Sequence, residues 1–200
     1  MLMAAHVWLA QGFLGVKHSG AFFTGCIAPD VRYMDSSISR ETTHSWEYAK
    51  SLIGDFGVGY RHHLAVDRAF YRRVERQPLL GRIGAMNLSV IAELHALRRF
   101  SQPTAMEVPD PTVLAELGVR SEALESFVDL STKYLELRDP ALAIGLLGGS
   151  LRQRAQRYLD HWQKYGSALK VLAIVAAPLL ESLFASIKHE AESYLSTEVE

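Results

Sequence analysis

Apolar residues recur at spacings of three and four along most of this chain, and no segment shows the strict alternation of a half-buried strand. We therefore predict an all-α protein, built as a helical bundle. The first helix is expected at residues 3–14. His6 would share a face with Met3, Ala10 and Phe13, because these positions are separated by three, four and seven residues. We expect that face to be buried.

The rest of the chain also divides into helical stretches separated by glycine and proline. Residues 17–33 should form a short helix and then a turn, with Asp30 placed at the turn by the preceding Pro29. The proline-rich residues 101–111 are the clearest connector. We expect one domain over residues 1–200, with a metal-site half (1–100) and a packing half (112–200). The remaining predicted helices span residues 41–53, 58–77, 80–100, 112–117, 121–137, 140–165 and 167–194.

Length, net charge and cysteine content limit the classes of protein to which this chain can belong. A chain of 200 residues can bury one substantial core, and its formal net charge of −1 gives no reason to expect a nucleic-acid partner. Cys26 is the only cysteine, so no intrachain disulfide can form, which fits a reducing compartment. The first residues lack the basic start and cleavage motif of a signal peptide, so we expect a cytoplasmic protein.

The strongest apolar run, residues 171–180, is too short for a bilayer crossing, which needs roughly 20 residues. We expect no transmembrane segment and interpret this run as a buried core helix. Contact with a membrane surface is the second interpretation.

The histidines carry the candidate chemistry, since six of the eight lie in the first 95 residues. The motif GYRHHLAVD, residues 59–67, places His63 and Asp67 one helical turn apart on one face, and Gly59 has no side chain to block that face. Imidazole and carboxylate ligands suit zinc, iron or manganese better than calcium or magnesium. The side chain of His62 leaves the helix about 100° away and is expected outside the pair. Alone, the pair also fits an ordinary hydrogen-bonded contact on a helix surface.

Three further positions complete the candidate site. Asp30 follows the apolar stretch AFFTGCIAP, which brings its carboxylate close to a core. The pair Thr43-His44 comes at an expected helix start shortly after Arg40, and His6 lies on the apolar face of the first helix. Each of these residues alone would also fit a structural role, and only their combination favours a metal site.

The order of these pieces resembles the zinc-dependent phospholipase C family, in particular its compact bacterial branch. The matching segments read AAHVWLA, GCIAPDVRY, RETTH and GYRHHLAVD, and the resemblance covers roughly residues 1–75. It implies an all-helical bundle with metal ions held between the helices. It also implies one or two zinc ions, with manganese or iron as substitutes. The implied metal ligands are His6, Asp30, His44, His63 and Asp67.

The resemblance implies a hydrolase of small-molecule or lipid phosphoric esters, in which metal-activated water attacks phosphorus. Asp30 or Asp67 would act as general base when it does not bind metal, and Arg40 or Arg61 would steady the phosphate. One alternative is another helical metallohydrolase, such as an HD-type phosphohydrolase or an acyl-carrier-protein phosphodiesterase. A second is a non-enzymatic helical protein that binds a partner through its apolar C-terminal segment. The sequence leaves the oligomeric state open.

Overall fold

The computed structural model describes residues 3–13, 19–34, 37–99, 105–139 and 149–197. Every regular element in these ranges is helical, which confirms the prediction of an all-α protein. The longer helices are α1 (Met3–Gln11), α5 (Gly54–Arg76), α7 (Ala85–Arg99), α8 (Ser121–Leu137), α10 (Gly149–Val175) and α11 (Ala177–Thr197). The shorter ones are α2 (Gly20–Gly25), α3 (Arg40–Thr43), α4 (Trp46–Ser51), α6 (Pro78–Ile83) and the 3-10 helices η1 (Ala28–Tyr33) and η2 (Pro111–Leu117).

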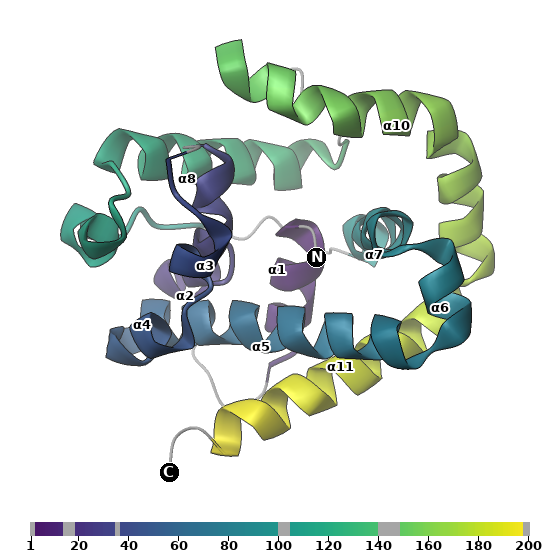
Figure 1. The fold of residues 1–200 in the computed structure, drawn as a ribbon, viewed down its shortest axis with the longest axis horizontal. Coiled ribbons are helices and arrows are strands. Elements are labelled where there is room, and N and C mark those ends of the chain that lie inside the picture. The colour runs from purple at the N-terminus through teal and green to yellow at the C-terminus, as the bar shows by residue number, and fades with distance from the viewer. Residues whose placement is uncertain (1–2, 14–18, 35–36, 100–104, 140–148, 198–200) are drawn as a thin grey trace.

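Helix α1 lies at the centre of the molecule, with α5 passing below it, α8 above it and α7 to its right in Figure 1. Helix α5 packs against α2 and α11, and α7 packs against α1 and α10. The back half of the chain thus packs on the front half through α10 and α11.

Helix α1 is buried on more than the single face that the sequence predicted. Six of its nine residues are buried, and three of them are alanines that let neighbouring helices approach from several sides. Met3 and Phe13 are only partly buried, whereas Ala10 and His6 are fully enclosed. His6 is thereby held in the protein interior. Leu14, the predicted end of this helix, lies outside the described residues.

The predicted helix over residues 41–53 is wrong, because the structure breaks it into α3 and α4. His44 is the C-cap of α3, and Ser45 starts α4 by accepting a hydrogen bond from the Tyr48 amide on its hydroxyl. A serine cap of this kind favours a new helix start. His44 thus ends a helix rather than beginning one. Asp30 lies in the first turn of η1, not in an open turn.

Two other breaks differ from the prediction. The expected helix over residues 80–100 is divided at Gly84, whose φ of +82° is readily adopted only by glycine. The final break falls at Ala176 and not near residue 166, since α10 continues through the buried Gly166. In contrast, the helix predicted over residues 121–137 matches α8.

Candidate metal centre

Two helices supply the innermost group of candidate ligands. His6 comes from α1, and His63 and Asp67 lie one turn apart on α5. The His6 and His63 rings stack with centroids 3.9 Å apart, and His6 Nε2 lies 3.3 Å from Asp67 Oδ1. One ligand atom from each of the three residues lies within 4.8 Å of the other two, and all three residues are buried. This group can hold a metal ion.

A second group shares His63 with the first. Asp30 reaches it from η1 and His44 from the end of α3, and their ligand atoms also lie within 4.8 Å of each other and of a His63 nitrogen. His44 Nε2 is 3.5 Å from Asp67 Oδ2, which links the two groups directly. The structure thus brings together all five residues that the sequence singled out, in two groups that share His63 and could each hold a metal ion.

The imidazole rings are oriented by contacts behind them. His63 Nδ1 lies 2.8 Å from the Cys26 carbonyl oxygen, which can only accept a hydrogen bond. Nδ1 therefore carries the proton, and Nε2 keeps a lone pair that can bind a metal. His44 Nδ1 lies 3.0 Å from the Thr43 hydroxyl. Such contacts fix the tautomer and orientation of metal-binding histidines.

Several nitrogens in this cluster lack a hydrogen-bond partner. They are both ring nitrogens of His6, Nε2 of His44 and Nε2 of His63, and all four are buried. The two distances to Asp67, 3.3 and 3.5 Å, fall within the range of an ion pair but lack the geometry of a hydrogen bond. Buried polar atoms are nearly always paired in proteins. A neutral imidazole has one nitrogen lone pair, so the three rings offer three nitrogen ligands beside two carboxylates, a set suited to a cation.

The protonation states also suit metal binding. Burial lowers the pKa of His6 well below its ordinary value and that of His63 to about 4. Burial acts to raise the pKa of Asp67, but the neighbouring His44 and His6 rings outweigh this effect and bring that pKa well below its usual range. At neutral pH the imidazoles are uncharged and Asp67 is ionised, which are the forms that bind metals. Burial raises the pKa of Asp30.

The two arginines proposed to steady a phosphate have different surroundings. Arg40 Nη2 donates to Asp67 Oδ2 at 2.9 Å, while 44% of the Arg40 side chain is exposed, so this residue joins the cluster to the solvent. Arg61 instead donates to the backbone carbonyls of Ala49 and Leu52 at the end of α4. Arg61 therefore holds a helix end, and Arg40 is the one of these two arginines that contacts the candidate site.

The sequence reasoning missed a buried carboxylate that positions α1. Glu93 Oε1 accepts from the Ala4 amide at 2.8 Å and from the Tyr134 hydroxyl at 2.6 Å, and Oε2 accepts from the Ala5 amide at 3.0 Å. These amides belong to the first turn of α1, where backbone N–H groups have no partner within the helix. The sequence feature that could have indicated a buried role for Glu93 is its place inside the apolar stretch AELHAL of α7. His95, two residues on, packs against Trp8 and Phe184 and is not part of the cluster.

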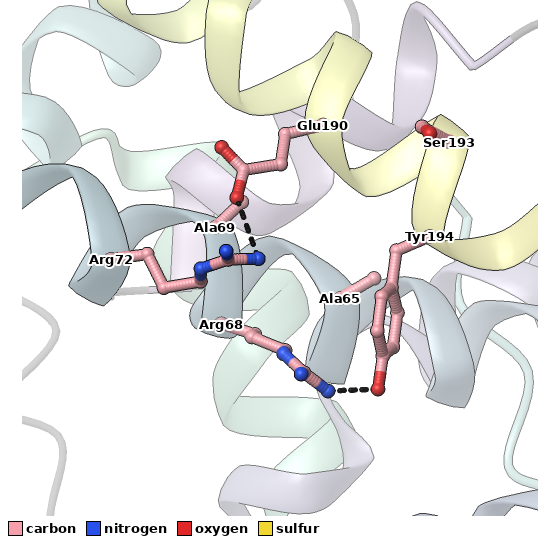
Figure 2. A pocket seen from close by; sticks show the side chains of 7 residues that line it. All are labelled: Ala65, Arg68, Ala69, Arg72, Glu190, Ser193 and Tyr194. Carbon is pink, nitrogen blue, oxygen red and sulfur yellow. Dashed lines mark hydrogen bonds and ion pairs between the residues drawn. The ribbon is translucent and has the colours of Figure 1, made fainter.

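A pocket of about 140 Å³ lies on another face of α5, against α11 (Figure 2). Arg68 in this pocket donates to the Tyr194 hydroxyl, and Arg72 Nη1 lies 3.3 Å from Glu190 Oε1. These contacts join the two helices. None of the residues that line this pocket belongs to the histidine cluster, so the two are separate.

Comparison with protein-family models, curated proteins and solved structures finds no match to this chain.

Proposed function

We propose that this protein is a metal-dependent hydrolase of phosphoric esters, with His6, Asp30, His44, His63 and Asp67 holding one or two zinc ions. The observation that carries the proposal is the set of buried imidazole nitrogens without hydrogen-bond partners that surround two carboxylates. Closed structural zinc sites usually rely on cysteine thiolates, and Cys26 contributes only its backbone carbonyl here. A cluster of histidine and aspartate favours catalysis.

A zinc ion in such a site supplies Lewis acidity and brings the pKa of bound water down toward neutral pH. Residues of the chain would bind the phosphate and accept the proton. Arg40 lies at the solvent side of the cluster, where its guanidinium can bind the oxygens of an incoming phosphate. Asp67 is engaged by Arg40 and two histidines. Asp30 has a longer contact with a single arginine, Arg32 Nη2 at 3.5 Å. Asp30 is therefore the carboxylate that would take a proton from water when it does not bind metal.

The test is a hydrolysis assay on chromogenic phosphate monoesters and diesters and on phospholipids. The parent protein would be stripped with a chelator and then supplied with zinc, manganese or iron. We expect turnover that requires metal, and we expect Asp67→Asn and His63→Ala to abolish it. His189→Ala, which changes an exposed histidine of α11, should leave turnover unchanged.

Equal turnover in the stripped and metal-loaded protein would reject this mechanism. Tight metal binding without turnover on any of these substrates would also reject it, and would favour a role in binding or in structure.

A further inference from the structure

The corner where α10 meets α11 carries a cluster of exposed aliphatic side chains. Val175 and Leu179 are the most exposed of them, at 73% and 75%. Isolated exposed apolar residues are ordinary, but contiguous patches mark sites of interaction. The sequence predicted a buried core helix over residues 171–180, and this is wrong for the outer side of that segment. The exposed members are Val171, Leu172, Ile174, Val175 and Leu179.

The corner has two clearly different sides. Leu169, Ala173 and Leu180 are buried in the core, so the fold already uses the inner side of both helices. The axes of Gln163–Val175 and Ala177–Ser196 differ by 77°, so the outer aliphatic side chains project from a bend. Among the described residues no single helix is long and apolar enough to cross a membrane, and only this bent pair passes that test when taken together.

Basic and aromatic residues border the patch. Lys164 and Lys170 are exposed on α10, and the Lys164 ammonium lies 5.1 Å from the centre of the Tyr165 ring. Tyr165 is itself partly exposed. Lysine and tyrosine side chains suit the border between acyl chains and lipid headgroups, because each has an apolar stem and a polar tip.

Acidic residues are absent from the sequence between Asp160 and Glu181. Glu181 forms an ion pair with Arg99 of α7, so its charge is balanced within the protein. The apolar patch therefore lies in a positively charged stretch, although the whole chain has a formal net charge of −1. Charge of this sign is complementary to an anionic lipid surface.

We propose that the α10–α11 corner docks the protein onto an anionic lipid bilayer, with its aliphatic tips among the acyl chains and Lys164 and Lys170 at the headgroups. A second copy of the chain is the less suitable occupant, because a symmetric contact would bring the lysines of both copies together. This proposal does not depend on the metal centre. It concerns a different face of the molecule and needs no turnover.

The test is sedimentation of the full chain with vesicles of phosphatidylcholine alone or mixed with phosphatidylserine. Binding should require phosphatidylserine and should weaken as salt is raised. The double variant Val175→Glu/Leu179→Glu should bind at least about tenfold more weakly, because it loses two aliphatic groups that would be buried among the acyl chains. Lys164→Glu/Lys170→Glu should lose about fivefold for each lysine. The matched control is Ile53→Glu, which changes an even more exposed aliphatic residue before α5 and should bind like the parent.

A second measurement reports insertion directly. Cys26 is fully buried, so a cysteine introduced by Val175→Cys can be labelled selectively with a polarity-sensitive dye. Its emission should shift to the blue on vesicles containing phosphatidylserine, and a label at Ile53→Cys should not shift. Unchanged vesicle binding by the Val175→Glu/Leu179→Glu variant would overturn the proposal. A parent dimer in solution that this variant dissociates would also overturn it, in favour of a second copy.

Discussion

Arg40 is the residue that connects the buried cluster to the solvent, through its 2.9 Å hydrogen bond to Asp67 Oδ2. We expect Arg40→Gln to keep its metal and to lose on the order of hundredfold to thousandfold in kcat/KM on phosphate esters, the scale seen when one charge-stabilising donor is removed. Arg40→Lys should recover part of this loss. The comparison needs steady-state kinetics together with metal analysis of each variant.

Arg76→Gln is the matched control for Arg40, because it removes an exposed arginine at the end of the same helix that carries Asp67. It should leave kcat/KM unchanged. Parent-like kinetics of Arg40→Gln would show that Arg40 only balances the charge of Asp67.

Glu93 should make the free energy of unfolding depend on pH. Burial raises the pKa of Glu93 above the ordinary 4.5 of the unfolded chain. At a pH between the ordinary and the raised pKa, the folded protein holds a proton that the unfolded chain has lost. The contribution of Glu93 to the free energy of unfolding therefore falls as pH rises through this interval. Glu93→Gln cannot titrate, and its stability relative to the parent should improve from acidic toward neutral pH. Urea denaturation at a series of pH values measures this, and parallel profiles would contradict it.

At the residue scale, the sequence could predict the residues of the candidate site but not the residues that hold them in position. Helical spacing was enough to place His63 beside Asp67 and to turn His62 away. His62 is indeed packed against the rings of Phe13 and Phe22. Glu93 could not be identified in the same way, because a glutamate in a helix is ordinarily a solvated residue. Its partners in α1 and α8 are 89 and 41 residues away in sequence.

At the element scale, the close contact of α2 with α5 positions the cluster. An added Cβ on Gly59 would lie 2.0 Å from the Phe22 carbonyl oxygen, and one on Gly25 would lie 2.2 Å from that of Phe56. Only glycine allows the two backbones to come this near. The contact also brings the Cys26 carbonyl to His63. Gly59 was expected to leave the metal face open, but the structure assigns it to this helix contact.

Gly59→Ala should therefore destabilise the protein by about 3 kcal/mol, since the new methyl group would push α2 away from α5. Gly12→Ala is the control, because the nearest atom to its new Cβ is the flexible tip of Lys188, at 3.3 Å. We expect that variant to stay within about 0.5 kcal/mol of the parent. Chemical denaturation gives both values, and equal stability of the two variants would show that the α2–α5 contact can relax.

The helices themselves could be predicted because an apolar spacing near 3.6 persists through them, as in α8. The breaks were harder to predict, because each depends on a local detail. Ser45 caps α4, and Gly84 adopts a left-handed conformation. Gly166 looked like a break in the sequence, yet it is buried inside a continuous helix.

At the scale of the whole molecule, the chain surrounds α1 with later helices, so residues from the first 67 positions meet in a buried space (Figure 1). Pattern alone could not predict which helices would close that space. It also could not predict that one side of the apolar run near residue 175 would remain exposed. Burial of that kind depends on how distant segments pack, which no local spacing encodes.

The most direct test of the metal centre is elemental analysis of the protein purified without a histidine tag, for the parent, His63→Ala and His62→Ala. The two histidines are adjacent and equally buried, so both variants should lose stability through a cavity, and only His63 belongs to the cluster. We expect one or two equivalents of zinc, manganese or iron per chain in the parent and in His62→Ala, and a loss of that metal in His63→Ala. A parent that holds no metal even after reconstitution, or a His63→Ala variant that holds as much as His62→Ala, would contradict the proposed centre.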